Sequence, residues 1–574
     1  MKQLEVADLF DQIADLLELK GENPFRIRAY RRAALNVRGL SEELGTLAGQ
    51  GALEKIPGVG KDLSAKILEF LSTGRLAFLE NLKKEIPESL STLMTVPGIG
   101  PKTAKLVYDR FQVKSIDHLE EVVRSGKLRS LPGVQQKKEE NILRGIQLLR
   151  SGRERMPLGS ALGLAEEVLA SLKSISEVER LSVAGSLRRR KETIRDIDVL
   201  VTSTNPKRVM DRFVTSKFVA QVQAHGETKS SIRTTQGTQI DLRVVEPESF
   251  GAALVYFTGS KEHNIRIRSL ANRLGLTVNE YGVFREKSGR RIAGKEEEDV
   301  YKVLGLAWIP PELREDRGEV EAAGSNRLPH LVERKDLKGD FHIHSNWSDG
   351  SHPVEEVARA VRRRGYRYML LSDHSKSLRI AGGLSESDLL RQMKHVHELN
   401  RALNPFRILM GAEVDVLPDG GLDYPDRILS RLDLVIAAVH SAFKQPKAVM
   451  TRRIAKALRN RYVTILAHPT GRLLGERDPY EVDLEEICRL SAQSNTALEI
   501  NCYTKRLDLN DLQAKRALEF GVKLVLSTDT HVLDQLNSME LGLAVARRAW
   551  GEPQDFLNAM SPPDLLAWVA QKRK

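Results

Sequence analysis

The C-terminal half of the chain repeats one pattern: a short apolar run, then a histidine or an acidic residue where the run stops. Segments with apolar residues at helical spacing separate these runs. This alternation predicts a β/α domain of parallel strands, a distorted form of the TIM barrel, over residues 338–574. In such a barrel the chemically active side chains lie at the carboxyl ends of the strands. We therefore expect one cluster of polar side chains at one end of this domain.

The residues at these positions have the chemistry of metal ligands. Imidazole nitrogens suit zinc and manganese. A lone histidine is usually a hydrogen-bonded or surface side chain, an interpretation that fits His352, His395 and His397. Six histidines and three acids at the ends of apolar runs instead favour a multinuclear metal site. Its candidate ligands are His342, His344, Asp349, His374, Glu413, His440, His468, Asp529 and His531.

A second candidate site, further upstream, has only oxygen ligands. Asp196 and Asp198 are two residues apart in an expected strand and so face the same side, and Asp241 adds a carboxylate from a later strand. Three carboxylates can bind two Mg²⁺ (or Mn²⁺) ions and activate an attacking hydroxyl. The alternative is that the two aspartates are surface acids paired with arginines between residues 188 and 195. The complete spacing favours the metal site, with Gly185, Ser186 and Arg189 beside it to hold phosphates.

Residues 1 to about 150 have the apolar spacing of helices, interrupted by short glycine turns. The segments 56–60 and 96–100 both read apolar-Pro-Gly-apolar-Gly, and a third copy at 131–134 lacks its second glycine. Glycine permits a sharp turn, after which the amides of the next helix can meet a phosphate. The alternative is an ordinary helix-turn-helix connection. Two full copies in a chain of net charge +12 favour DNA binding through Gly58, Gly60, Gly98 and Gly100.

Composition limits the remaining possibilities. At 574 residues the chain is too long for one core, and roughly three or four domains are expected. Its two cysteines form no spaced framework, which favours a reducing compartment. No apolar run approaches the roughly 20 residues that a membrane span requires, and the start lacks the apolar stretch of a signal peptide. We expect a cytoplasmic protein, without membrane contact and monomeric.

The segment 185–198, together with Asp241, resembles the palm of family X DNA polymerases. The segment 256–260 and Asn264 resemble the nucleotide-binding thumb segment of that family. The resemblance implies a binding site for a deoxynucleoside triphosphate (dNTP) formed by Tyr256, Phe257, Gly259, Ser260, Lys261 and Asn264. Tyr256 and Phe257 would lie against the sugar, Asn264 would contact the base edge, and Lys261 would pair with a phosphate. Arg268 would contact the template minor groove. Lys261 and His263 replace an aspartate and an aromatic residue of the family, and Gln239 replaces an arginine that poises an acid of the metal site.

The first 80 residues resemble the 5′-deoxyribose-phosphate lyase domain of the same family. Lys66 stands where that domain has its Schiff-base lysine, and a solvated lysine is the alternative. A lysine must lose its proton before it attacks an aldehyde. Phe25, Arg26 and Asp62 stand where the family has histidine and two lysines, so the expected pocket is less basic.

Residues 338–574 resemble a PHP (polymerase and histidinol phosphatase) domain. The resemblance implies three ions, Zn²⁺ or Mn²⁺, and hydrolysis of phosphate esters. His342, His344, Glu413 and Asp529 would bind one ion. Glu413, His440 and His468 would bind the second, and Asp349, His374 and His531 the third. Because every ligand is kept, we expect an active nuclease.

The whole chain thus resembles a bacterial family X DNA polymerase with a C-terminal PHP domain. The expected domains are a lyase-like domain with a helix-hairpin-helix motif at 1–80, all-α fingers at 81–150, an α+β nucleotidyltransferase palm at 151–247 and thumb at 248–316, a linker at 317–337, and the PHP domain.

The implied function is filling of short gaps in gapped or primer-template DNA during base excision or end repair. The PHP domain would add 3′-5′ exonuclease and possible abasic-endonuclease or 3′-phosphatase activity. Alternatives are a repair nuclease or scaffold with a weak polymerase, and a small-molecule phosphomonoesterase.

Overall fold

The computed structural model describes residues 2–20, 22–38, 44–56, 58–85, 87–94, 96, 99, 101–130, 139, 142–143, 146, 155–235, 237–474 and 477–574. The chain forms two compact units. One consists of residues 1–155, 261–278 and 284–290, and the other of residues 156–260, 279–283 and 291–574. No helix in the described part of the chain is long and apolar enough to cross a membrane.

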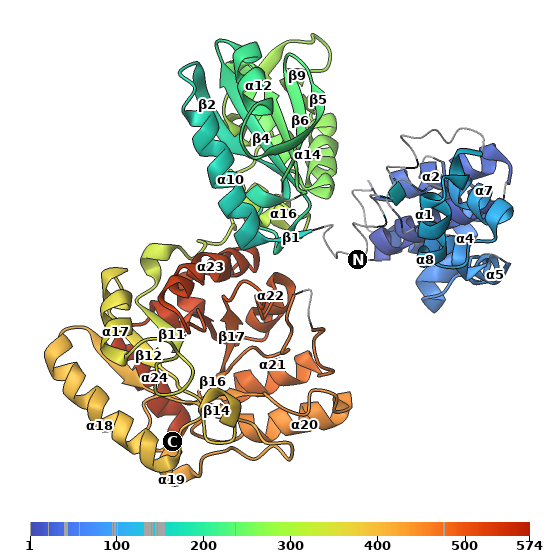
Figure 1. The fold of residues 1–574 in the computed structure, drawn as a ribbon. Helices are drawn as coiled ribbons and strands as arrows, with labels where there is room; N and C mark the ends of the chain where they lie inside the picture. Colours follow the sequence, from blue (N-terminus) through green and yellow to red (C-terminus); the bar gives the residue numbers. More distant parts are fainter. Residues whose placement is uncertain are drawn as a thin grey trace. The chain divides into compact units, whose positions relative to one another are not determined.

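The described residues of the N-terminal segment form helices joined by short turns, with no strand among them (Figure 1). Apolar side chains such as Phe10, Ile13 and Leu17 recur at helical spacing and are buried in one core, which draws residues from all the longer helices. The elements are α1 (Lys2–Lys20), α2 (Pro24–Arg38), α3 (Leu44–Gly49), η1 (Leu53–Lys55), α4 (Lys61–Thr73), α5 (Ala77–Glu85), α6 (Glu88–Met94), α7 (Pro101–Phe111), α8 (Ile116–Arg124) and η2 (Lys127–Ser130).

The palm region is a five-stranded sheet of order β2-β4-β7-β6-β5. Its two central strands, β4 (Asp196–Ser203) and β7 (Gln239–Val244), are parallel, and all other pairs are antiparallel. Buried and half-buried residues alternate along β7, which gives the sheet one core face and one polar face. The other elements are β1 (Met156–Pro157), α10 (Leu158–Lys173), β2 (Val178–Val183), α11 (Gly185–Arg188), β3 (Thr193–Ile194), α12 (Pro206–Val214), β5 (Val219–His225), β6 (Lys229–Thr234) and η3 (Pro247–Ser249).

The next segment begins with two consecutive helices, α13 (Phe250–Thr258) and α14 (Lys261–Arg273). Residues 317–337, expected to be a linker, contain helix α16 and pack onto the C-terminal domain, where Val332 N donates to Gly551 O at 2.9 Å. The other elements of this segment are β8 (Leu276–Asn279), β9 (Gly282–Arg285), β10 (Arg291–Ala293), α15 (Glu297–Val303), η4 (Pro311–Leu313), α16 (Glu319–Gly324) and η5 (Arg334–Asp336).

The described residues of the C-terminal domain form eight parallel strands in two sheets, of orders β11-β12-β13 and β14-β15-β16-β17-β18. Single parallel bridges, Ile343 to Thr530 and His374 to Glu413, connect the two sheets. Apart from Arg407 at the start of β13, the residues of these strands are buried, as expected of parallel strands covered by helices. The strands are β11 (Gly339–Ile343), β12 (Tyr368–Leu371), β13 (Arg407–Met410), β14 (Glu413–Asp415), β15 (Ile436–Ala438), β16 (Ile465–Leu466), β17 (Ala497–Asn501) and β18 (Leu524–Ser527).

Helices surround these strands on several sides (Figure 1). Helix α17 has a strongly one-sided apolar pattern, and its buried residues include Val354, Val357 and Val361. The helices are α17 (Val354–Arg363), η6 (Arg379–Ala381), α18 (Glu386–Leu403), α19 (Asp426–Leu429), α20 (Lys447–Leu458), α21 (Leu484–Gln493), α22 (Asp511–Glu519), η7 (Leu533–Ser538), α23 (Met539–Arg548), η8 (Pro553–Asp555), η9 (Leu557–Ala559) and α24 (Pro562–Arg573).

Candidate metal centres and nucleotide site

The three palm carboxylates lie on the two parallel central strands. Asp198 on β4 is the register partner of Asp241 on β7, and Asp196 precedes Asp198 by two residues on the same face. Burial, reinforced by repulsion from Asp196 and Asp241, raises the pKa of Asp198 to about 6. A divalent cation would relieve this repulsion, so the donor set fits a hard cation.

Gly185 approaches this site closely. A Cβ atom on Gly185 would lie 2.4 Å from Oδ2 of Asp198, and its φ of +60° is left-handed. Only glycine satisfies both conditions, which explains the glycine of the Gly185-Ser186 pair. The turn thereby places the start of α11 against the carboxylate.

Two polar side chains orient Asp241. Its Oδ1 accepts hydrogen bonds from Ser231 Oγ at 2.6 Å and from Gln239 Nε2 at 3.0 Å. Gln239, where the family has an arginine, therefore still contacts the acid, but without a positive charge. Arg195 forms an ion pair of 3.2 Å with Asp196. One of the two aspartates therefore does pair with a nearby arginine, as the alternative interpretation of these acids expected.

The two arginines of the palm turn have different partners. Arg188 forms two hydrogen bonds of 2.7 Å with Glu297 and one of 2.8 Å with Thr258. Arg189 donates to the carbonyl of Thr258 and, at 3.0 Å, to Glu315. Both guanidinium groups are therefore held by protein groups next to the carboxylates.

The predicted nucleotide-binding residues are distributed over several elements. Gly185 and Ser186 lie on α11, and Arg189 directly follows it. Tyr256 and Phe257 end α13, with an edge-to-face ring contact of 5.1 Å. After Gly259, Ser260 N donates to Arg314 O at 2.9 Å. Lys261, Asn264 and Arg268 lie on α14, where Arg268 Nε donates to Asn264 O at 3.3 Å.

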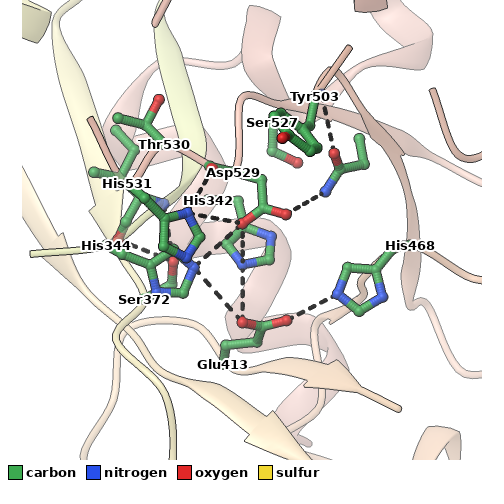
Figure 2. Close-up of polar contacts among 12 residues, drawn as sticks. His342, His344, Ser372, Glu413, His468, Tyr503, Ser527, Asp529, Thr530 and His531 are labelled. Atoms are coloured by element: carbon green, nitrogen blue, oxygen red, sulfur yellow. Dashed lines mark hydrogen bonds and ion pairs between the residues drawn. The ribbon is translucent and has the colours of Figure 1, made fainter. Parts of the chain in front are cut away.

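Several candidate ligands of the C-terminal domain contact the Glu413 carboxylate, which faces His342 and His468 in Figure 2. Oε1 of Glu413 lies 3.0 Å from His468 Nε2 and 3.1 Å from His440 Nε2. Oε2 lies 2.9 Å from His374 Nδ1 and 3.2 Å from His342 Nε2. One carboxylate thus contacts four imidazoles: that of His342 lies on β11, and those of His374, His440 and His468 follow β12, β15 and β16.

Three groups of potential ligands have their ligand atoms within 4.8 Å of one another. Of the residues that the structure describes, only these form such a group, so the palm acids do not. The groups are His342, His344 and Asp529; His374, Glu413 and His440; and His344, Asp349, His374 and His531. All nine predicted ligands therefore lie in one cluster, counting His468 through its contact with Glu413.

The chemistry of the cluster fits metal ions. Both ring nitrogens of buried His344 lack a hydrogen bond to any described residue, although carboxylate oxygens lie 3.4 to 3.7 Å away. Burial and the neighbouring His374 and His531 lower the pKa of His344 to about 4. Against the effect of burial, Glu413 raises the pKa of His374 to about 10 and that of His440 to about 9. Cations would replace protons at these nitrogens.

Two acids that the sequence did not single out hold ligand histidines. Glu499, on β17, contacts His342 Nδ1 at 2.7 Å, Ser527 Oγ at 2.6 Å and the amide of His468. Asp415, on β14, contacts His440 Nδ1 at 2.5 Å. Such carboxylate–imidazole pairs orient metal-binding histidines. Glu499 carried a usable signal, because it is a charged residue inside the otherwise apolar run 497–500.

Other histidines of the domain have separate partners. His352 pairs with Glu356 at 3.3 Å, His395 with Glu355 at 3.5 Å, and His397 contacts Arg401 at 3.2 Å. None of the three belongs to a ligand group among the described residues.

In the N-terminal segment Lys66 lies on α4, with its side chain 12% exposed. Its ammonium group pairs with Asp62 and lies 4.9 Å from the centre of the Phe78 ring. Gly58 has a φ of +83°, and Gly60 caps α4. Gly98 and Gly100 lie outside the described residues, as does the third glycine turn.

Five family models match the chain. They are a helix-hairpin-helix domain at 1–76, a SAM-like helix-hairpin-helix tandem at 90–147, the DNA polymerase beta palm at 155–247, the DNA polymerase beta thumb at 253–315, and a PHP domain at 340–502. The chain is 38% identical over 571 residues, 99% of both proteins, to the DNA polymerase/3′-5′ exonuclease PolX of Bacillus subtilis (strain 168). The chain belongs to the bacterial family X DNA polymerases with a PHP domain.

Two further relatives of this family X polymerase each match one half. DNA polymerase lambda of Rattus norvegicus is 26% identical over 289 residues, 45% of this chain and 48% of that protein. A probable phosphatase of Thermoanaerobacter sp. (strain X514) is 28% identical over 246 residues, 41% of this chain and 95% of that protein. The predicted fold class, with helix-hairpin-helix domains, polymerase palm and thumb, and a PHP domain, is thereby confirmed.

Proposed function

We propose that this family X polymerase fills short gaps in DNA during base excision or end repair, and that its PHP domain removes nucleotides from 3′ ends. The observation that carries the first half is the pairing of Asp198 with Asp241 across two parallel strands beneath the Gly185 turn. Whole-length similarity to the PolX of Bacillus subtilis supports both the gap-filling and the 3′-end-removal activity.

In the palm, Asp196, Asp198 and Asp241 would hold Mg²⁺ or Mn²⁺. Such ions activate the attacking 3′-hydroxyl and neutralise charge on the leaving pyrophosphate. Ser231 and Gln239 orient Asp241 through Oδ1, which leaves its other oxygen available. Ser186, Arg189 and Lys261 would bind the phosphates, Tyr256 and Phe257 would contact the sugar and Asn264 the base edge, with Gly259 and Ser260 in the same nucleotide-binding segment.

In the PHP domain the nine clustered side chains would hold three ions, Zn²⁺ or Mn²⁺. Such ions polarise a phosphodiester and supply a nucleophile at neutral pH. The protein's own contribution is orientation: Glu499 fixes His342, and Asp415 fixes His440. The resulting activity is 3′-5′ exonuclease, with 3′-phosphatase or abasic-site cleavage as related reactions.

The DNA partner is gapped or primer-template DNA. Gly58 and Gly60, and by the sequence pattern Gly98 and Gly100, bring backbone amides to phosphates without reading bases. Arg268 on α14 contacts the template minor groove. We also propose that the chain acts as a monomer.

The test is gap filling by a variant with Asp196→Ala and Asp198→Ala. Synthesis should fall to background while 3′-end removal keeps its wild-type rate. Asp211→Ala, which removes an exposed palm acid, is the control and should change neither activity. Retained synthesis in the double variant would exclude these aspartates from the polymerase site.

A second candidate function is hydrolysis of small phosphomonoesters. It is favoured by the probable phosphatase that matches over 95% of its own length. Comparison of kcat/KM for a free sugar phosphate and for a DNA 3′ end decides between them. A preference for DNA supports the exonuclease, and a much faster sugar phosphate reaction supports the phosphomonoesterase.

A further inference from the structure

A cavity of about 460 Å³ lies in the C-terminal domain. Its size is within the range of small-molecule sites. Its lining comes from the loop after β11, from the loop before α18 and from the first turns of α18. The lining residues are Asn346, Trp347, Gly382, Leu384, Asp388 and Arg391.

The cavity lining is linked to the metal-ligand cluster at two points. Asn346 and Trp347 lie between the candidate ligands His344 and Asp349 in one short loop. Leu384, another lining residue, donates from its backbone N to the carbonyl of His374, a third candidate ligand, at 2.8 Å. The lining is thus joined to the candidate ligands by the chain at one point and by a backbone hydrogen bond at the other.

The loop that carries Trp347 is held in place. Buried Asp373 accepts hydrogen bonds from Ser345 N at 2.8 Å, from Ser345 Oγ at 2.6 Å and from Ser348 Oγ at 2.5 Å. A Cβ on Gly382 would lie 3.3 Å from the carbonyl of Ser348, so the two loops approach closely. Trp347 is thus presented on a fixed wall.

The lining favours a flat polar heterocycle. Trp347 offers an indole ring, and the Arg391 guanidinium lies 6.0 Å from its centre. Asn346 adds an exposed amide, which can both donate and accept hydrogen bonds. Asp388 adds a carboxylate that pairs with Arg391 and accepts a hydrogen bond from Ser385 Oγ at 2.6 Å, and it can accept a further hydrogen bond from a base amino group. The cavity therefore suits the base of a nucleotide, with the phosphate on the side of the ligand cluster.

We propose that this cavity binds the 3′-terminal nucleobase of a DNA strand, stacked on Trp347, while the adjacent cluster holds the scissile phosphate. Hydrolysis adds one water across the last phosphodiester, releases a deoxynucleoside 5′-monophosphate and leaves a new 3′-hydroxyl. The inference rests on the proposed exonuclease function and assigns its base subsite. Stacking on an aromatic ring tolerates any base, as removal of successive nucleotides requires.

The test compares two single-stranded substrates, one ending in a normal nucleotide and one ending in a nucleotide without a base. The wild-type chain should hydrolyse the normal end with a kcat/KM about five- to a hundredfold higher, the range that stacking of one base provides. Trp347→Ala should lose that advantage on the normal end and keep the wild-type rate on the baseless end. Trp347→Phe should retain most of it. Trp568→Ala, which truncates a half-buried indole on α24, is the control and should keep the wild-type preference.

The outcomes separate the base subsite from a structural role. An equal loss on both ends in Trp347→Ala, or no loss on either, would overturn the inference. Equilibrium binding of a deoxynucleoside 5′-monophosphate gives a readout without turnover, and Trp347→Ala should weaken it by a similar factor. If the wild type hydrolysed neither end, the proposed exonuclease would fail. In that case, weaker binding of the deoxynucleoside 5′-monophosphate by Trp347→Ala would still support the base subsite. Binding that Trp347→Ala leaves unchanged would overturn the base subsite.

Discussion

Arg548, on α23 of the C-terminal domain, donates a 2.7 Å hydrogen bond to the main-chain carbonyl of Arg189 in the palm. The same guanidinium pairs with Glu315 at 2.9 Å and with Asp511 at 2.7 Å. Glu315 in turn pairs with the side chain of Arg189 at 3.0 Å. A residue of the PHP half therefore fixes an arginine that we assign to the nucleotide triphosphate.

Arg548→Ala should impair the polymerase half from a distance. Arg548 is 2% exposed, and its loss leaves Asp511 paired with Arg317 and Glu315 paired with Arg189 and Lys191, at a cost of about 2 kcal/mol in stability for the lost charged hydrogen bonds. Glu315 then competes with the triphosphate for Arg189, and KM for dNTP should rise several-fold. Steady-state gap filling and urea unfolding measure both effects. Arg547→Ala, which removes the neighbouring and more exposed arginine, should change KM little; an equal rise in both variants would contradict the specific role of Arg548.

Glu297→Gln should remove a pH-dependent contribution to stability. Arg314 and Arg188 hold the pKa of buried Glu297 at about 2, against the effect of burial, below its ordinary value of 4.5. A lowered acid pKa stabilises the folded state fully above about pH 5, and the contribution is lost as pH falls from 4.5 toward 2. Unfolding free energies should differ by about 3 kcal/mol at pH 6, with a smaller difference at pH 3.5. A difference independent of pH would show that the charge of Glu297 does not matter.

Magnesium dependence of synthesis should shift with pH. Burial and the two neighbouring aspartates raise the pKa of Asp198 to about 6, so this carboxylate is protonated in part of the metal-free molecules below pH 6. Mg²⁺ must displace that proton. The Mg²⁺ concentration at half-maximal gap filling should therefore rise as pH falls from 7.5 to 5.5. If the Mg²⁺ concentration at half-maximal gap filling stayed constant over this pH range, the assignment of Asp198 as a metal ligand would be contradicted.

Lys66 is proposed as a lyase nucleophile, and its ion pair with Asp62 opposes that role. The Lys66 nitrogen is held against the Asp62 carboxylate and must leave this ion pair before it can reach an aldehyde carbon. Borohydride trapping on a 5′-deoxyribose-phosphate end should give an adduct with the wild type, more adduct with Asp62→Asn and none with Lys66→Ala. Lys61→Ala, which removes an exposed lysine of the same helix, should behave as the wild type. An adduct that survives in Lys66→Ala would exclude Lys66.

The candidate metal ligands could be predicted from the sequence because each lies at or near the end of an apolar run, and parallel strands gather their ends in one place. Glu413 and His440 meet in this way although 27 residues separate them. The supporting acid Asp415, on the same strand as Glu413, was not predicted because a second carboxylate two residues after the first has no distinguishing spacing. The contact of Arg548 with Arg189 joins residues 359 apart in the sequence, and no periodic pattern of residues predicts a contact between them. Local spacing therefore predicts ligands, whereas contacts between domains depend on packing.

The central claim is that synthesis and 3′-end removal use separate sites in one chain. The most direct measurement follows one 5′-labelled primer in Glu413→Gln, with and without dNTPs. Glu413 contacts four imidazoles, so 3′-end removal should fall by more than about a hundredfold while gap filling keeps its wild-type rate. Wild-type removal in Glu413→Gln, or loss of gap filling with stability unchanged, would contradict two independent sites.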